Sequence, residues 1–253
     1  MRLVTIGFSH YCEKARWALD RSKLEYVEEA HAPLLSYASS VRKARSRTVP
    51  VLLTDEGAFT DSSDILEYVD PFNPPEKRLY PEHEAMRREV VAIEDKVDIT
   101  IGPRVRRWAY SWLVREDALV RPLIRATMSR GERVLRPFVE KPILLAIERG
   151  LKLSPDLRES LFDKLMVSFE ELGAALEGKK YFVGDAFTAA DLTFAALVSP
   201  CVYPPEQPFP FPPLASLPVG MQKQIEAFRG TRAGTHALQM YREERNAKPF
   251  KPE

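Results

Sequence analysis

The sequence predicts an α/β domain followed by an all-α domain. In the first part of the chain, short apolar runs alternate with helical segments, whereas later the apolar residues recur every three or four positions, as on amphipathic helices. A proline-rich stretch between the two patterns indicates a stiff linker. We therefore expect an α/β domain at residues 1–72, a linker at 73–83 and an all-helical domain at 84–253.

Composition excludes several classes of protein. The 253 residues carry 37 basic and 36 acidic side chains, a net charge of +1, so no strong field favours nucleic acid or an anionic membrane. The most apolar stretch, 187–202, contains Asp191 and Pro200 and is too short to span a bilayer. Cys12 and Cys201 do not form a disulfide framework. A strand directly at the start leaves no room for a signal peptide, and we expect a soluble cytoplasmic protein.

The first domain begins with a βαβ unit. Residues 2–7 are expected to form a strand, 10–22 a helix and 24–27 a second strand, which pairs in parallel with the first. Residues 28–47 are polar, include a basic cluster and are expected to be irregular.

A β-hairpin and a helix complete this domain. Two apolar runs flank the turn signal Asp55-Glu56-Gly57, and a helix is expected to begin near Ser62 and end at Asp70-Pro71. The order βαβ followed by ββα is that of the thioredoxin fold.

The second domain is predicted to be a set of amphipathic helices. A long one runs from Met86 to Trp112, with a kink at Gly102-Pro103. A second helical stretch, 117–147, should break near Gly131 and at two prolines, Pro137 and Pro142.

Further helices follow towards the C-terminus. One begins at Ser154-Pro155, and another follows a capping-box pattern at Thr188–Asp191, for which we expect a purely structural role. Eight prolines in 199–218 indicate an extended crossing, after which a last helix at 219–242 should break around 230–234. The tail beyond these helices should fray.

The turn between the first strand and the first helix carries the main chemical signal. Ser9 and Cys12 have the spacing of a C-x-x-C redox motif, but serine stands first. A serine hydroxyl cannot form a disulfide, yet it can donate a hydrogen bond to a thiolate that another molecule brings to a helix N-terminus. The alternative interpretation is that Ser9 is an ordinary N-cap residue.

Four short motifs resemble those of soluble glutathione S-transferases with a serine-type active-site turn, and they occur in the expected order. They are Ser9 to Arg16, similar to the active-site turn; Val49-Pro50-Val51-Leu52, similar to the cis-proline strand; Asp61 to Tyr68, similar to the glutathione-binding element; and Phe182 to Asp191, similar to the helical-domain capping motif. The resemblance covers most of the chain. It implies a glutathione-dependent enzyme that conjugates or isomerises a small hydrophobic electrophile in detoxification, with no metal, and a homodimer.

The resemblance also implies roles for single residues. Ser62 is expected to bind the γ-glutamyl carboxylate and Asp61 its amino group, while the Val49 backbone pairs with the cysteinyl backbone. Ser9 is expected to donate to the sulfur. Lowering a thiol pKa by about two units takes roughly 2.7 kcal/mol, which one hydrogen bond to a charged acceptor, about 1.5–3 kcal/mol, can supply with help from the helix end. The group that holds the glycine carboxylate is open, with Arg45 or Arg47 suitable.

The second substrate is expected beyond the sulfur. The resemblance implies a pocket formed by Tyr11 and by Trp108 or Tyr110, although Trp108 also fits the apolar stripe of its helix and can be a core residue. Residues 102–136 carry nine arginines against three acidic residues. These arginines are either a solvated helix face or dimer rim, or part of a pocket for an apolar molecule that bears a carboxylate.

Two alternative functions stay open. A non-catalytic binding or scaffold protein can keep this fold, but it needs neither Ser9 nor the Asp61-Ser62 pair. A glutathione-dependent thiol reductase would use Cys12, which aligns with the resolving position of a redox motif and is otherwise a small, semi-buried residue. Ser9 occupies the attacking position of the redox motif, where a reductase needs a cysteine, and this disfavours the reductase.

Overall fold

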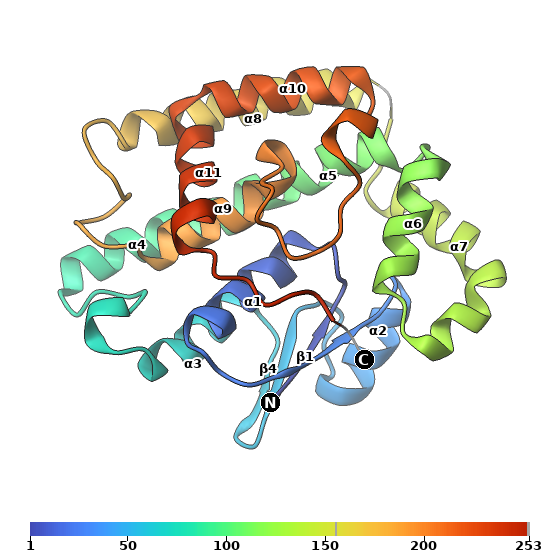
Figure 1. The fold of residues 1–253 in the computed structure, drawn as a ribbon, viewed down its shortest axis with the longest axis horizontal. Helices are drawn as coiled ribbons and strands as arrows, with labels where there is room; N and C mark the ends of the chain where they lie inside the picture. The colour runs from blue at the N-terminus through green and yellow to red at the C-terminus, as the bar shows by residue number, and fades with distance from the viewer. Residues whose placement is uncertain (155, 252–253) are drawn as a thin grey trace.

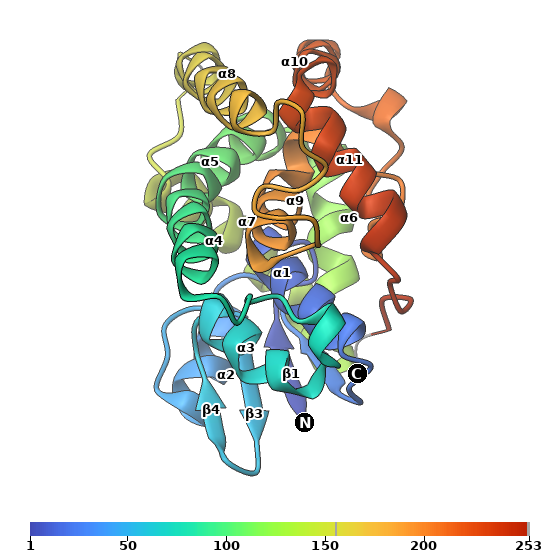
Figure 2. The same cartoon turned by 90° about the vertical axis from the view of Figure 1, so that its left-hand side faces the viewer.

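The structure confirms the predicted fold class. In a computed structural model that describes residues 1–154 and 156–251, a thioredoxin-like α/β N-terminal domain precedes an all-helical C-terminal domain. The sheet and its helices lie below, and the later helices are stacked above them (Figures 1 and 2). No helix in the described part of the chain is long and apolar enough to cross a membrane.

The N-terminal domain is built on a four-stranded mixed sheet of order β2-β1-β3-β4. β1 pairs in parallel with β2 and antiparallel with β3, which pairs antiparallel with β4. The strands are β1 (Arg2–Thr5), β2 (Val27–Ala30), β3 (Val51–Thr54) and β4 (Gly57–Phe59). The helices are α1 (His10–Arg21), α2 (Leu35–Ala44) and α3 (Ser62–Val69). α1 packs against α3 and also against α9 (Ala189–Val202), so it joins the sheet to the helical layer.

Two expectations for this domain are wrong. The second strand lies at Val27–Ala30 rather than at 24–27, and the segment expected to be irregular contains α2. α2 begins without a signal that a sequence reading can use: its N-cap residue Leu34 has φ 71° and caps no backbone group with its side chain.

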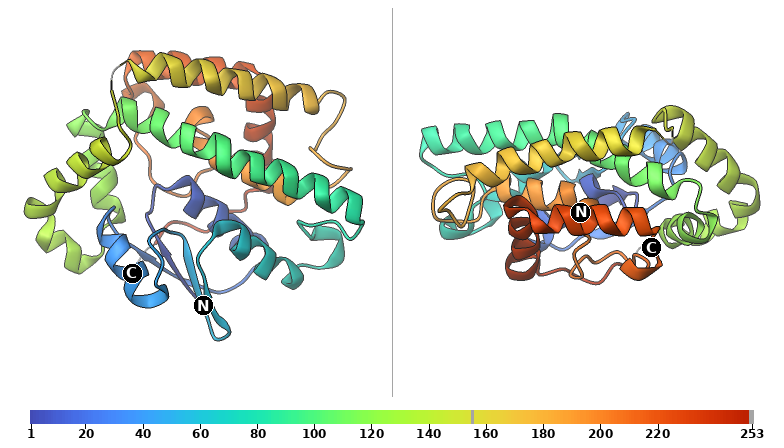
Figure 3. Two further views of the ribbon diagram at one scale, coloured as in Figure 1. Left: turned by 180° about the vertical axis from the view of Figure 1, so that it is seen from behind. Right: turned by 90° about the horizontal axis from the view of Figure 1, so that it is seen from above.

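The long first helix of the helical domain is interrupted, as predicted, next to Gly102-Pro103. α4 (Glu84–Lys96) passes through a π-helical turn at Val97–Ile101 into α5 (Gly102–Leu113), and the pieces form one continuous rod (Figure 3). Gly102 allows Tyr11 to approach, because a side chain there would collide with the Tyr11 hydroxyl. The interruption therefore lies directly against the first turn of α1.

The next two helices differ from the prediction. α6 (Asp117–Thr127) and α7 (Arg130–Gly150) are separated at Met128-Ser129, and α7 runs unbroken through the predicted breaks at Gly131, Pro137 and Pro142. A capping box at Ser129 starts α7. Farther along, the buried Glu140 pairs with arginines of both helices, Arg121, Arg125 and Arg136.

The remaining helices follow the predicted pattern. They are α8 (Leu157–Ala175), α9, which the capping box of Thr188 and Asp191 starts, α10 (Val219–Gly230) and α11 (Arg232–Glu244). Pro155, predicted in the first turn of α8, lies outside the described residues. Between α9 and α10 the proline-rich stretch is irregular apart from a 3-10 turn at Leu214–Ser216.

The C-terminal tail is packed, contrary to the expectation that it frays. Arg245 is buried, with Nε 2.7 Å from Glu13 Oε1 and Nη1 2.8 Å from Asp20 Oδ2. The Phe250 ring lies against Phe209 and beneath the Arg16 guanidinium. The last described residues thus tie the helical domain to α1.

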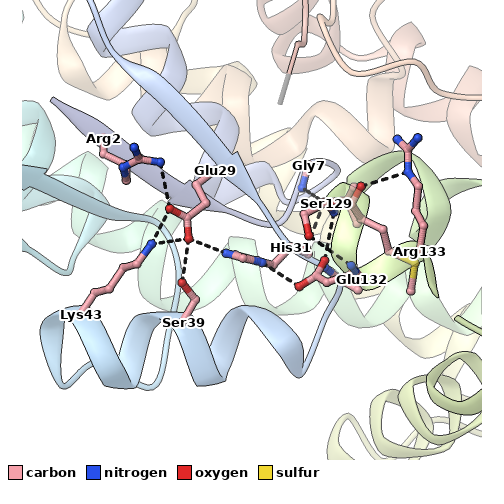
Figure 4. Close-up of polar contacts among 12 residues, drawn as sticks. Arg2, Gly7, Glu29, His31, Ser39, Lys43, Ser129, Glu132 and Arg133 are labelled. Carbon is pink, nitrogen blue, oxygen red and sulfur yellow. Dashed lines mark hydrogen bonds and ion pairs between the residues drawn. The ribbon is translucent and has the colours of Figure 1, made fainter. Parts of the chain in front are cut away.

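The α6–α7 pair is attached to the N-terminal domain through His31 (Figure 4). His31 Nδ1 lies 2.7 Å from Glu132 Oε1 at the start of α7, and Nε2 lies 2.8 Å from Glu29 Oε1 on β2. The Thr127 hydroxyl donates to the His31 carbonyl and accepts from the Gly7 amide. Burial opposes protonation of His31, but its hydrogen bonds to Glu132 and Glu29 outweigh burial and raise its pKa above 6.5.

This arrangement predicts a stability that depends on pH. A histidine whose folded pKa is raised stabilises the fold below its unfolded pKa and loses that contribution as pH rises through the folded pKa. We expect His31→Gln to lower the free energy of unfolding by roughly 1.5–3 kcal/mol below about pH 6, and by progressively less at alkaline pH. Denaturant melts across pH measure this, with the exposed His83→Gln as control. A deficit that does not shrink with rising pH contradicts the assignment.

Candidate functional site

A cavity of about 320 Å³ lies between the two domains, at the N-terminal end of α1. Its walls come from the turn at Ile6–Tyr11, from the segment 34–49 that includes part of α2, from α5 and α6, and from the chain that follows α9. Most of the wall is apolar or aromatic, and a cavity of this size suits a small molecule. The predicted residues Ser9, Tyr11, Val49 and Tyr110 all line it.

Ser9 caps α1 and faces this cavity. Its Oγ accepts a hydrogen bond from the Cys12 amide at 3.5 Å, so Ser9 is the N-cap residue of α1, as the alternative interpretation expects. The Ser9 hydroxyl donates to no oxygen or nitrogen of the described chain, and its other neighbour is the Cys12 thiol, a weak acceptor. Since a hydroxyl has one donor in addition to its acceptor sites, the Ser9 proton is free to reach an acceptor in the cavity.

The Val49 backbone is available for a ligand. The Val49-Pro50 peptide bond is cis, and β3 starts only at Val51. Within the described chain neither the Val49 N–H nor its C=O makes a hydrogen bond. Arg47, two residues earlier, also lines the cavity and has no ion pair to a described residue. An extended peptide lying along Val49 would meet both backbone groups, with a cation near one end.

Asp61 and Ser62 lie at the N-terminus of α3, beside α1 and outside the cavity wall. The Lys14 Nζ on α1 donates to Ser63 Oγ at 2.8 Å, which fixes the two helix starts next to each other. Asp61 is exposed, and its Oδ1 accepts from the Ser63 amide at 2.8 Å, so it is the N-cap of α3. Ser62 is 4% exposed, and its hydroxyl has no partner among the described residues.

This capping role suits an aspartate at position 61. Aspartate is among the best N-cap residues, whereas glutamate is too long to cap in the same way. One carboxylate oxygen of Asp61 holds the helix start, and the other faces outward. The sequence reading treated Asp61 only as a ligand residue and missed this structural role.

Tyr11 and Tyr110 lie on opposite elements of the cavity wall. The Tyr11 hydroxyl donates to the Asp98 carbonyl in the π-helical turn at 2.8 Å. Burial raises the pKa of both tyrosines, and Arg106 opposes the shift in each. Both phenols are therefore neutral at physiological pH. The Tyr110 hydroxyl has no hydrogen bond to a described residue.

Trp108 belongs to the core rather than to the cavity. It is fully buried, its Nε1 donates to Gln224 Oε1 at 2.7 Å, and its ring packs edge-on against Phe228. It is absent from the cavity wall, where its neighbours Ala109 and Tyr110 contribute instead. Trp108 is therefore a core residue, as its place in the apolar stripe indicated, and it is not part of the second-substrate pocket.

Cys12 is closed off behind the turn. Its side chain is fully buried and does not line the cavity. Burial raises its pKa to about 11, although Arg16 opposes the shift. A thiol that is protonated and inaccessible at neutral pH is poorly suited to disulfide exchange.

The cavity contains two polar side chains that the sequence reading did not single out. His10 is 5% exposed, and neither ring nitrogen makes a well-formed hydrogen bond within the described chain. Burial and, to a smaller extent, the nearby Arg106 lower its pKa to about 3 against a weak contact with the Leu197 backbone, so the imidazole is neutral. Arg106, on α5, lines the cavity and pairs with no described carboxylate. Their positions depend on how α5 crosses α1, which local sequence patterns do not reveal.

No group of described residues in the structure has the composition of a metal site. Two charged side chains of α1, Lys14 and Arg16, are buried. Lys14 bridges Glu94 and Asp98, and Arg16 pairs with Glu13 and Glu28.

Comparison with known protein families gives two matches. The description "Glutathione S-transferase, N-terminal domain" matches residues 3–76, and "Glutathione S-transferase, C-terminal domain" matches residues 133–218. Together these segments span more than half of the chain. No curated protein sequence matches it.

Solved structures with the same fold are distant in sequence. A glutathione S-transferase from Rhodospirillum rubrum F11 is 19% identical, with a TM-score of 0.57, over 100% of this chain and 96% of its own. The beta-etherase LigF from Sphingobium sp. strain SYK-6 is 20% identical, with a TM-score of 0.61, over 94% and 98%. A glutathione S-transferase from Methylobacillus flagellatus KT, solved with glutathione bound, is 16% identical, with a TM-score of 0.53, over 93% and 98%. These likenesses concern the fold.

Proposed function

Since the chain belongs to the glutathione S-transferase family, we propose that it is a glutathione-dependent enzyme that conjugates or isomerises a small hydrophobic electrophile. The observation that carries the proposal is the Ser9 hydroxyl. It stands at the N-terminus of α1, opens on the cavity, and has a proton that no described oxygen or nitrogen accepts. We further propose that the protein acts in the cytoplasm, in detoxification, as a homodimer and without a metal.

Glutathione would lie along the N-terminal domain. Its γ-glutamyl end reaches the start of α3, where the Ser62 hydroxyl and amide receive the carboxylate and the outward oxygen of Asp61 receives the ammonium group. Its cysteinyl backbone pairs with the free N–H and C=O of Val49. Arg47 is the cation available to the glycine carboxylate.

The chemistry then follows from the position of the sulfur. With the cysteinyl backbone on Val49, the thiol lies near Ser9 and the end of α1, where a hydrogen bond and the helix dipole favour the thiolate. The thiol proton goes to solvent. The sulfur forms a bond to the electrophilic carbon, and the displaced group leaves with the electron pair or the substrate takes up a proton.

The two alternatives are less well supported. A thiol reductase acting through Cys12 needs an accessible thiolate, and the Cys12 side chain is buried with its pKa raised to about 11. A non-catalytic binding protein has no use for a cavity beyond the sulfur that carries unpaired polar groups.

Glutathione binding tests this proposal directly. We expect the wild-type protein to bind glutathione in a calorimetric titration. Ser62→Ala should weaken binding about tenfold, because a hydrogen bond to a charged group is lost. Asp61→Asn should weaken it by a similar factor, and since asparagine is an equally good N-cap, this change removes the charge while keeping the start of α3.

The control is Ser168→Ala, which removes a serine hydroxyl that is 5% exposed on α8, away from the cavity. It should bind glutathione as the wild type does. Absence of binding to the wild-type protein, or equal affinities in all four proteins, would refute the proposed function.

A further inference from the structure

The cavity is apolar but has a cationic end. Its charged lining residues are Arg47 and Arg106, and no described aspartate or glutamate lines it. Arg47 lies beside Val49 in the N-terminal domain, whereas Arg106 projects from α5 near His10, Tyr11 and Tyr110. The two cations therefore serve different parts of the space, and glutathione bound along Val49 leaves Arg106 without a partner.

Arg106 differs from the other arginines of its segment. Most of the nine in 102–136 hold the helical domain together by pairing with carboxylates or backbone carbonyls, as Arg115 does with Glu148 and Arg107 does with the Leu151 carbonyl. Arg106 is the one that lines the cavity, and it has no ion pair or hydrogen bond to a described residue. The paired interpretation thus fits most of the group, whereas Arg106 is exposed and unpaired at the cavity wall.

The groups beside Arg106 add hydrogen-bonding capacity without a competing charge. The Tyr110 hydroxyl has no partner among the described residues, and the neutral imidazole of His10 makes only a weak contact with the Leu197 backbone. The surrounding surface is aromatic: the Phe8 ring packs edge-on against Tyr110 with centroids 6.4 Å apart, and Phe211, from the segment after α9, also lines the cavity. Such walls favour a planar, apolar body, and a free guanidinium favours a carboxylate attached to it.

We propose that Arg106 is the specificity-determining residue of the second-substrate cavity and that it selects an aromatic electrophile bearing a carboxylate. This inference rests on the proposed function, because it takes the cavity as the place of the second substrate. The carboxylate pairs with the Arg106 guanidinium, His10 and Tyr110 supply neutral hydrogen bonds, and the ring lies between Phe8 and Phe211.

A matched pair of probes isolates the charge: para-chlorodinitrobenzoate and its methyl ester. In both, the glutathione sulfur forms a bond to the chlorine-bearing carbon, chloride leaves with the bonding pair, and the thiol proton goes to solvent. We expect the wild-type enzyme to prefer the acid after correction for uncatalysed rates. Arg106→Gln should reduce kcat/KM for the acid about tenfold more than for the ester, the loss expected for one charge-assisted hydrogen bond.

Arg104→Gln is the control. It makes the same change of charge two residues away on α5, at a side chain outside the cavity wall. It should leave the preference for the acid intact. An equal loss on both probes in Arg106→Gln, the wild-type preference retained in that variant, or the same change in Arg104→Gln would overturn the proposal.

A binding measurement separates this inference from the proposed function. Dinitrobenzoate and its methyl ester lack the leaving group, and their binding is followed by quenching of tryptophan fluorescence in the absence of glutathione. Tighter binding of the acid that Arg106→Gln abolishes supports the anion subsite even if conjugation is never observed. Equal binding of acid and ester to the wild-type protein refutes it even if conjugation proceeds.

Discussion

Replacing Ser9 with alanine is expected to lower kcat/KM for conjugation about 10- to 100-fold, because it removes one hydrogen bond to a charged sulfur. In the structure the Ser9 proton has no oxygen or nitrogen acceptor among the described residues, so a thiolate competes only with the weak acceptor Cys12. Glutathione affinity should change much less, since Ser62, Asp61 and the Val49 backbone hold the remainder of the molecule. Steady-state kinetics with glutathione and either chlorodinitrobenzoate probe measure the loss.

The same substitution also removes a helix cap, which alone costs about 1 kcal/mol of stability. Ser129→Ala provides the matched control, because Ser129 caps α7 in the same way and does not line the cavity. It should lose comparable stability and keep full activity. If Ser9→Ala conjugates at the wild-type rate, Ser9 does not stabilise the thiolate.

The largest effect on stability is expected at Lys14. Its ammonium group is fully buried, 2.9 Å from Glu94 Oε1 and 2.5 Å from Asp98 Oδ2, and it also donates to Ser63. Lys14→Met keeps most of the side-chain volume but leaves both carboxylates buried without their cation. We expect the free energy of unfolding at neutral pH to fall by about 3–5 kcal/mol in chemical denaturation.

Acidification should reduce the loss of unfolding free energy that Lys14→Met causes. Burial raises the pKa of Asp98, and Lys14 opposes that shift, so removing Lys14 raises the pKa further. An acid with a raised folded pKa binds more protons in the folded state, and its penalty is present above that pKa and disappears as pH falls below it. Lys96→Met, which breaks the exposed pair with Glu171, should change stability by less than about 1 kcal/mol. A similarly small effect at Lys14 would contradict the buried network.

The elements that the sequence predicted well are those with local signals. Ser9 before α1 and the capping box at Thr188 mark two helix starts at their observed positions. α2 was not predicted, because its N-cap residue, Leu34, has a positive φ and no capping side chain. Local patterns thus predict an element only where the element has a local cause.

Tertiary contacts account for the errors in the second half. Proline in a helix removes one hydrogen bond, and both Pro137 and Pro142 were expected to end α7. The helix continues past them, because the two prolines are exposed and ion pairs at Glu140 join α7 to α6. Such pairing between helices is not visible in a local pattern.

One part of the candidate site was likewise predictable from local motifs, whereas the other depends on tertiary packing. The residues proposed to bind glutathione lie on short segments with recognisable motifs: Ser9, Val49, Asp61 and Ser62. The part of the cavity proposed for the second substrate depends on which face of α5 lies against α1. A rotation of α5 by less than one helical turn would change that face. The observed orientation of α5 buries Trp108 in the core and brings Arg106 to the cavity. Neither assignment follows from the spacing of apolar residues alone.

The most direct test of the account is the pKa of the glutathione thiol when it is bound to the protein. Ultraviolet absorbance of the thiolate, followed against pH at saturating protein, gives this value for the wild type and for Ser9→Ala. We expect a pKa about two units below the reference thiol value of about 8.5 in the wild type, and a value near that reference in Ser9→Ala. Bound glutathione that titrates in the wild-type protein as it does in free solution would contradict the central role of Ser9.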